Sequence, residues 1–315
     1  MRPVIVFLRE PPHIPFVRLH RIGFLVSVVL TLVSIGLLAT RGLNFGIDFR
    51  GGIVMELRAN EPKADLEKLR GTLNGLGLGE VSLQTFGAPN DVLVRLPRQP
   101  GDDAAQNRGV ELVHRTLGTD YEYRRTEVVG PKVGNELIKA GTWATILSML
   151  AIAAYVWFRF EWQFGIGAVV STLHDVITTL GLFSLLQLEF NLATLAAILT
   201  IAGYSINDTV VIYDRVRETM RRYKSLAFGD LINLSLNETL SRTVLTSTVT
   251  ALAVLALLLF GGEVIRGFSA AMLWGIVVGT YSSLFIAAPI LLYIRPRRAR
   301  EPAAASAEQR VAAKS

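Results

Sequence analysis

Six long apolar runs constrain the fold of this 315-residue chain more than any other feature. A helix of about 20 apolar residues crosses the hydrocarbon core of a bilayer, where only helices and closed barrels satisfy their backbone groups. The overall apolar share of 51% is close to the 45–50% typical of soluble domains, so the clustering decides the class. We predict an α-helical polytopic membrane protein with transmembrane helices at residues 22–40, 140–158, 164–188, 192–213, 244–260 and 270–294.

Residues 41–139, between the first two apolar runs, have the mixed and charged composition of a soluble domain. Alternating apolar residues predict strands at 53–58, 81–86, 92–96 and 121–129, and helical spacing predicts helices at 65–76 and 104–117. The order βαββαβ is that of a ferredoxin-like split unit. The sequence therefore predicts a small α+β ferredoxin-like domain between transmembrane helices 1 and 2.

The basic residues predict how the chain crosses the membrane. Four arginines precede the first span, and six Lys or Arg lie in each of the segments 214–243 and 295–315. The short connections on the other side carry none at 189–191 and one, Arg266, at 261–269. Because short cytoplasmic segments are rich in Lys and Arg, we place residues 1–21, 214–243 and 295–315 in the cytoplasm. The α+β domain is then extracytoplasmic, and the Ala- and Glu-rich tail is predicted to be disordered.

Composition argues against several other functions. The net charge of +6 comes from residues that flank apolar runs, and no nucleic-acid-binding motif accompanies it. The chain has no cysteine, and its four histidines lack the spacing of metal ligands. We therefore expect no nucleic-acid partner, no metal and no cofactor, and we do not expect an enzyme.

One carboxylate stands out inside the fourth apolar run. Asp208 lies in the stretch GYSINDTVVIYDRVRE at 203–218, next to Asn207 and with no cation beside it. A charged group in a membrane helix costs about 2.5–3.5 kcal/mol on insertion scales, so such residues usually have a partner or a task. Asp208 lies roughly 24 Å along the helix from the outer start of this span, which places it in the cytoplasmic third.

Arg242, at the start of the fifth span, lies at a depth from which it can reach Asp208. The fourth span has a polar side with Tyr204 and Asn207, and the fifth has a hydroxyl stripe with Thr246. These residues would form a supporting polar seam, or the hydroxyls would serve only to pack the helices closely. Arg242 would modulate proton binding by Asp208, or would simply snorkel to the interface. A polar seam around Asp208, with Arg242 as its modulator, would form a proton relay. Hydroxyls that only pack the helices and an arginine that only snorkels would have a structural role.

His174 and Asp175 interrupt the third apolar run and admit two interpretations. Asp175 would support the fourth span by bonding to Tyr204 or Asn207, or it would be a second proton-relay group. Neighbouring residues point about 100° apart on a helix, so only one of the pair can fully face the polar seam. We favour the supporting role.

Two glycine motifs flank the α+β domain, and we interpret both as structural junctions. In GIDFRGG at 46–52, Gly46 and Asp48 follow the first span, and Gly51 and Gly52 permit the tight backbone that starts a strand. A phosphate-binding loop would be followed by a helix instead. In VVGPKVG at 128–134, Gly130 ends a strand and Pro131 suits the first position of the next helix.

Together these motifs resemble the SecD/SecF family, and within it the SecF members. The resemblance covers residues 21–294 and rests on GIDFRGG (46–52), VVGPKVG (128–134), LHD (173–175), GYSINDTVVIYDRVRE (203–218) and NETLSRT (237–243). It implies six spans in the inner membrane of a bacterium that assemble with a SecD-like subunit into a twelve-span complex of the RND type.

The resemblance also implies a function. Such a complex uses the proton-motive force to help secreted polypeptides leave the SecYEG channel, with YajC and YidC as further partners. Asp208 is similar to the family's proton-carrying residue, and Arg242 to its modulator. An alternative is an RND-type proton-coupled exporter of small solutes, although six spans make only half of such a core. A passive membrane scaffold would leave Asp208 and its polar seam unexplained.

Overall fold

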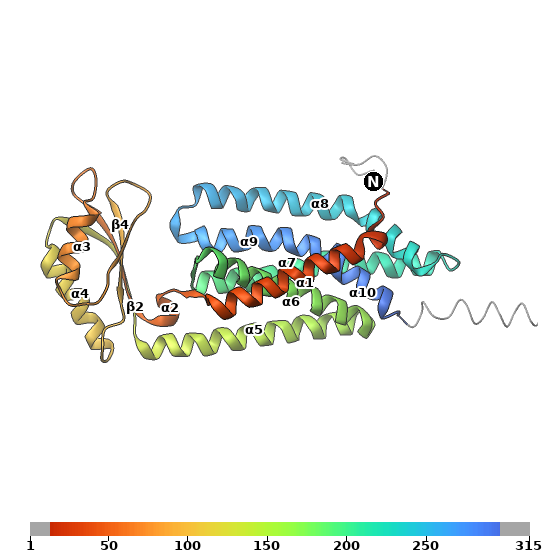
Figure 1. Cartoon of the computed structure of the whole chain (residues 1–315), viewed down its shortest axis with the longest axis horizontal. Helices are drawn as coiled ribbons and strands as arrows, with labels where there is room; N and C mark the ends of the chain where they lie inside the picture. Colours follow the sequence, from red (N-terminus) through yellow and green to blue (C-terminus); the bar gives the residue numbers. More distant parts are fainter. Residues whose placement is uncertain (1–12, 297–315) are drawn as a thin grey trace, which may run out of the picture.

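A computed structural model describes residues 13–296, which form a helical bundle with an α+β domain at one end (Figure 1). Within this range, six helical segments are long and apolar enough to cross a membrane. They are α1 (Phe16–Thr40), α5 (Pro131–Arg159), α6 (Trp162–Leu186), α7 (Leu192–Arg222), α8 (Phe228–Phe260) and α9 (Glu263–Ser282), which continues through a π-helical turn (Ser283–Ala287) into α10 (Ala288–Tyr293).

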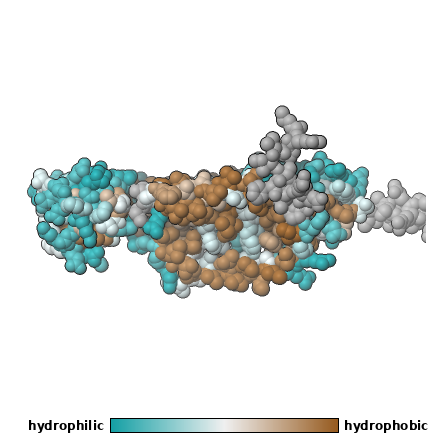
Figure 2. All heavy atoms as spheres, turned by 90° about the horizontal axis from the view of Figure 1, so that it is seen from above, coloured by the Kyte–Doolittle hydropathy of each residue, from teal (hydrophilic) through white to brown (hydrophobic). Residues whose placement is uncertain are grey.

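The surface of the bundle has the polarity expected in a bilayer. A broad apolar zone covers its middle, and hydrophilic residues gather on the α+β domain and at the opposite end (Figure 2). Many large apolar side chains are exposed there, among them Leu150 on α5 and Leu252 on α8 at 59% and 61%. A soluble protein rarely exposes so large a contiguous apolar patch, so this zone faces lipid.

Two helices extend well beyond the apolar runs. Helix α7 continues to Arg222, and α8 already begins at Phe228, so much of the polar segment 214–243 is helical. Hydropathy marks the part of a helix that prefers lipid and not where the helix ends. The predicted limits of the spans within the bilayer therefore stay predictions, and the predicted disordered tail lies largely outside the described residues.

The α+β domain is a four-stranded antiparallel sheet with two helices. Strands β2 (Gly52–Ala59), β3 (Ser82–Thr85), β4 (Asp91–Pro97) and β5 (Tyr121–Val129) lie in the order β3-β4-β2-β5. Alternate residues of β2 and β4, such as Ile53 and Val94, are fully buried against α3 (Leu66–Asn74) and α4 (Asp103–Leu117). The period-2 pattern thus places the core on one face of the sheet.

An ion pair joins the ends of two central strands. The Arg58 guanidinium on β2 donates to both carboxylate oxygens of Asp91 on β4, with nitrogen–oxygen distances of 2.6 and 2.8 Å. Asp91 is only 5% exposed. The hydrogen bonds from Arg58 hold the pKa of the Asp91 carboxyl below its usual value. The pair therefore makes the stability of this domain depend on pH.

We predict that Arg58→Met destabilises the α+β domain near neutral pH. It leaves a buried carboxylate without its partner, which costs about 1–3 kcal/mol. Because the folded-state pKa of Asp91 lies below the unfolded value of about 3.9, the contribution of the pair is complete above about pH 4 and is lost as the pH falls through the folded-state pKa. Hydrogen exchange of the full chain measures both effects.

The control for this prediction is Arg115→Met, which removes an exposed arginine of the same domain. The difference in protection between the Arg58 and Arg115 variants should shrink in acid, once Asp91 is neutral in both. Equal protection of the two variants at neutral pH would contradict the importance of the pair.

Candidate functional site

Helix α7 lies at the centre of the bundle and packs against α5, α6, α8 and α9. Its polar residues divide between two sides. Ser205, Asp208 and Thr209 are buried against neighbouring helices, whereas Thr200 and Asn207 are exposed on the surface of this chain. The candidate site comprises the buried side of α7 and the side chains that meet it.

Asp175 on α6 joins three helices through its carboxylate. One oxygen, Oδ2, accepts hydrogen bonds from Ser205 Oγ on α7 at 2.6 Å and from Ser282 Oγ on α9 at 2.8 Å. The other, Oδ1, lies 3.0 Å from His174 Nδ1. Asp175 is completely buried, and these contacts offset the cost of removing its carboxylate from water.

The partners of Asp175 differ from those expected. We expected Tyr204 or Asn207, but Asn207 is exposed, and within the described residues the buried Tyr204 hydroxyl has no hydrogen-bond partner. Ser205, which is adjacent to Tyr204 and points about 100° away from it on the helix, takes this place. Sequence reasoning also missed Ser282, although consecutive serines at 282–283 in an apolar run are a visible signal.

His174 points to the other side of α6. It borders an apolar groove of about 360 Å³ on the surface between α1 and α6, together with Phe24 and Leu173. Its Nε2 atom is buried and has no partner among the residues that the structure describes. As expected for adjacent helical residues, Asp175 and not His174 faces the buried side of α7.

Asp208 follows Ser205 by about one turn of α7 and has fewer contacts than Asp175. It is 4% exposed, and among residues 13–296 its carboxylate accepts one hydrogen bond, from Ser247 Oγ on α8 to Oδ2, at 3.5 Å. Such a distance is long for a hydroxyl donor, which usually lies 2.5–3.0 Å from its acceptor. Ser247 also lies 2.7 Å from Thr280 Oγ1 on α9. This carboxylate is thus buried but weakly held, and a change in its protonation would break little else.

Arg242 is close to this region but is not bonded to Asp208. Its side chain is exposed on α8, and among residues 13–296 no ion pair of 4 Å or less joins it to a carboxylate. The Thr246 hydroxyl donates to the backbone carbonyls of Arg242 and Thr243 on its own helix. The structure thus brings Asp208 together with Ser247, a residue that the sequence did not single out, and leaves Arg242 on the surface.

The GIDFRGG motif binds the outer end of α7. After α1, the short strand β1 (Asn44–Phe45) pairs in parallel with β6 (Glu189–Phe190), directly before α7. The Gly46 amide donates to Phe190 O at 2.8 Å, and Asp48 Oδ2 accepts from the first amide of α7, Leu192 N, at 2.8 Å. A carboxylate is favourable at a helix N-terminus, where amides are unpaired.

The α+β domain reaches the same loop through a side chain. Arg95 on β4 forms an ion pair with Glu189 on β6. A Cβ on Gly46 would lie 2.6 Å from the Glu189 carboxylate, so the loop approaches the motif closely at this glycine. Gly52 has a φ of 139° and would bring a Cβ within 2.7 Å of Leu96 O. Together, these contacts connect the domain, the loop 189–191 and the start of α7.

The second motif forms the other connection to the domain. Helix α5 begins at Pro131, directly after Gly130, where a Cβ would overlap the Asp103 side chain of α4 at 1.7 Å. Gly134 lies over the short helix α2 (Ile47–Arg50), and a Cβ there would lie 3.0 Å from Phe49 O. The two glycine motifs therefore meet at one junction between domain and bundle.

Comparison with known proteins shows which family this chain resembles. The family model described as "Protein export membrane protein SecD/SecF, C-terminal" matches residues 110–297, and the SecD/SecF GG motif matches residues 36–63, which include GIDFRGG. Similar curated proteins include the protein translocase subunits SecF of Rickettsia felis, 48% identical, and of Desulfurispirillum indicum, 45% identical. Each match covers 90% of this chain, and 92% and 93% of the respective relatives.

Solved structures of SecDF proteins are similar to this chain as well. The crystal structure of SecDF from Thermus thermophilus, described as a translocon-associated membrane protein, is 37% identical and superposes with a TM-score of 0.80 over 94% of this chain. SecDF in a super-membrane-facing form gives a TM-score of 0.69 at 36% identity. This chain spans 40% and 42% of those longer chains. The chain belongs to the SecD/SecF family of protein-export membrane proteins.

Proposed function

We propose that this chain is the SecF-type accessory subunit of a Sec protein-export complex, in which Asp208 carries protons that drive export. Family membership and the names of the relatives support the role in export. The observation that carries the proton mechanism is the Asp208 carboxylate, which is buried within the bundle and, in the part of the chain that the structure describes, is held by a single long hydrogen bond. The names of the relatives describe a transport subunit and not an enzyme.

The exposed polar side of α7 and α8 supports a SecD-like partner. These packed helices expose Thr200, Asn207, Arg242 and Thr246. Polar and charged side chains are unfavourable where a helix faces lipid, whereas small and polar residues suit a contact between helices. The matched SecDF chains, which are more than twice as long, contain room for the complementary half. We therefore assign this surface to the SecD-like subunit.

In this mechanism Asp208 changes charge while the rest of the bundle stays assembled. A proton neutralises the carboxylate, and Arg242 approaches it when the carboxylate is charged and withdraws when it is neutral. One charge that crosses a potential of 100 mV releases about 2.3 kcal/mol. That energy can shift an equilibrium between two arrangements of similar stability. Protons are the coupling ion, and no cofactor takes part.

Helix α7 would transmit this change to the α+β domain. Asp208 and Leu192 lie on the same continuous helix, and Asp48 and the pair β1–β6 hold its first turn. The sheet order β3-β4-β2-β5 supports a ferredoxin-like domain, which Arg95 connects to the same loop. A tilt or shift of α7 would therefore move the domain relative to the membrane.

The surroundings of the complex follow from the family and from the charge pattern. We place the chain in the bacterial inner membrane with both termini in the cytoplasm and the α+β domain outside. The translocating polypeptide leaves SecYEG on that outer side, and YajC and YidC complete the assembly. A small-solute exporter of the RND type is not favoured, because the relatives are named as protein translocase subunits.

We predict that Asp208→Asn abolishes the part of export that depends on the proton gradient, because an amide cannot carry the proton. Vesicles that contain the SecD-like partner and the translocon would show export of a secretory protein with and without a gradient. Asp230→Asn, the same change at an exposed position of α8, is the control and should export normally. Gradient-stimulated export by an assembled Asp208→Asn complex would disprove the relay.

We also predict that Asp48→Ala weakens the connection between the domain and α7. Loss of a capping carboxylate costs about 0.5–2 kcal/mol, so amides in the first turn of α7 should exchange faster and gradient-driven export should fall. Asp65→Ala removes a comparable cap from α3, where Asp65 accepts from Lys68 N, and should affect only that helix. If export is unchanged while the first turn of α7 exchanges faster, this contact does not transmit the movement.

A further inference from the structure

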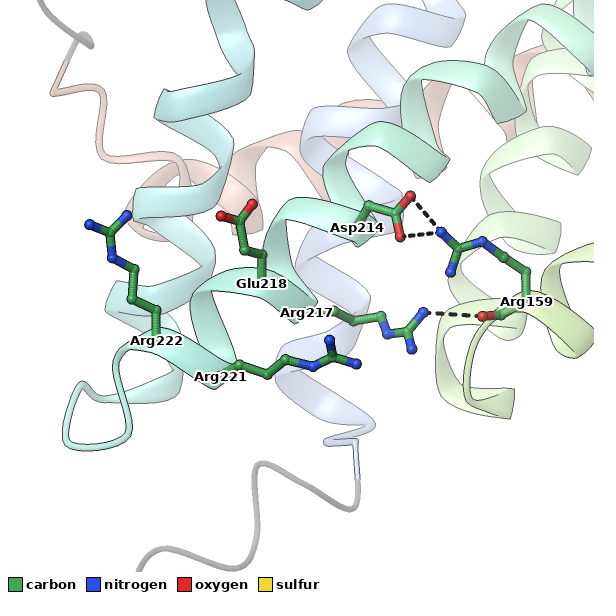
Figure 3. Close-up of a pocket in the computed structure, with 6 residues that line it drawn as sticks. All are labelled: Arg159, Asp214, Arg217, Glu218, Arg221 and Arg222. Atoms are coloured by element: carbon green, nitrogen blue, oxygen red, sulfur yellow. Dashed lines mark hydrogen bonds and ion pairs between the residues drawn. The ribbon is translucent and has the colours of Figure 1, made fainter.

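A charged pocket lies at the end of the bundle that is remote from the α+β domain. It has a volume of about 410 Å³ and is formed by the end of α5 and the polar extension of α7 (Figure 3). Four arginines and two carboxylates line it, so its net charge is +2; the six residues are Arg159, Asp214, Arg217, Glu218, Arg221 and Arg222. Neither the export function nor the proton mechanism uses this pocket.

Both carboxylates in the pocket already have an arginine partner. Asp214 accepts two hydrogen bonds from Arg159 Nη2, at 3.0 and 3.1 Å. Glu218 pairs at 2.7 Å with Arg215, which also pairs with Glu238 at 2.6 Å. Arg217 donates to the backbone carbonyl of Arg159 at 3.1 Å, and this bond fixes its position without neutralising its charge. The other three arginines of the pocket, Arg217, Arg221 and Arg222, therefore form no ion pair with a carboxylate in the described chain.

Three of the four arginines gather on one side of α7 (Figure 3). Arg217 and Arg221 extend to the same side as Arg159, whereas Arg222 points away from them (Figure 3). The guanidinium carbons of Arg159 and Arg217 lie 5.1 and 5.2 Å from the centre of the Phe160 ring. Such stacking orders a guanidinium. The N–H groups that do not bond to Asp214 or to the Arg159 carbonyl can bind the oxygens of a phosphate.

Exposed aromatic residues place this pocket at the membrane surface. Tyr155, Trp157 and Phe158 on α5 are 54%, 69% and 95% exposed, and Trp162 at the start of α6 is 49% exposed. Aromatic side chains of this kind gather where the hydrocarbon core meets the headgroups. Because α5 ends at Arg159, between Phe158 and Trp162, the pocket lies at headgroup level and borders the lipid-facing surface of α5.

We infer that this pocket binds the headgroup phosphate of an anionic phospholipid, whose acyl chains lie along α5. Positive charge without an acidic partner, ordered guanidinium groups and a neighbouring apolar surface fit the two parts of such a molecule. A soluble phosphate compound would use the arginines but not the exposed surface of α5. The site does not depend on the proton relay, so the relay can fail without affecting it.

Tryptophan fluorescence in the full chain provides the test. Trp143→Phe and Trp274→Phe leave Trp157 and Trp162 as reporters beside the pocket. In phosphatidylcholine vesicles, we expect brominated phosphatidylglycerol to quench them at a mole fraction at which brominated phosphatidylcholine has little effect. Equal quenching by the two lipids would overturn the proposal.

Substitutions then assign the preference to the pocket. Arg221→Gln removes a side chain with no hydrogen bond or ion pair among the described residues, so it should not disturb folding. We expect it to weaken the preference for phosphatidylglycerol about fivefold, corresponding to about 1 kcal/mol per arginine. Arg217→Gln should weaken it by a similar factor.

The matched control is Arg21→Gln, an exposed arginine at the same end of the bundle on α1. It should keep the full preference for phosphatidylglycerol. If Arg21→Gln weakened the preference for phosphatidylglycerol equally, the lipid would be attracted to the charged surface in general. That result would overturn the proposal of a specific site. The measurement is repeated with the SecD-like partner bound. If binding disappears there, the pocket belongs to the contact between the subunits and the lipid proposal fails.

Discussion

The carboxylate of Asp175 holds three helices of the bundle in register. It is fully buried in α6 and accepts hydrogen bonds from Ser205 on α7 and Ser282 on α9. A buried charge that lost these donors would be strongly destabilised, so the bonds fix how α7 is rotated about its axis. That rotation turns Asp208 toward Ser247 on α8 and leaves Asn207 on the surface. The candidate proton site and the proposed contact with the SecD-like subunit both depend on it.

The contrast between the two buried carboxylates suggests a division of roles. Among the described residues, Asp175 has short contacts to three side chains, whereas Asp208 has one long hydrogen bond. A group whose bonds hold helices together cannot change protonation without disturbing them, and a weakly held group can. This favours structural support by Asp175 and proton binding by Asp208. Helix α7, which carries Asp208, begins beside Asp48 and the pair β1–β6, where the domain is connected to it.

Sequence patterns predicted those features that lipid and a buried core impose directly. Long apolar runs led to six helices because a bilayer requires them, and alternation located the strand at Ile53 and Met55. Periodicity orders residues around one helix but does not fix its rotation relative to a helix about 30 positions away. Ser205 was therefore missed in favour of Tyr204. The two-residue strand pair between Phe45 and Phe190 was missed because it is too short to show alternation.

The central claim is that the charge of Asp208 sets the position of the α+β domain through α7. The chain has no cysteine, so spin labels at Arg70→Cys on α3 and Leu259→Cys near the outer end of α8 can report their separation by pulsed electron paramagnetic resonance. The measurement uses the complex with its SecD-like partner in vesicles. The account predicts that a proton gradient changes the distribution of distances in the native complex but not after Asp208→Asn. An equal change in both complexes, or none in the native complex, would contradict it.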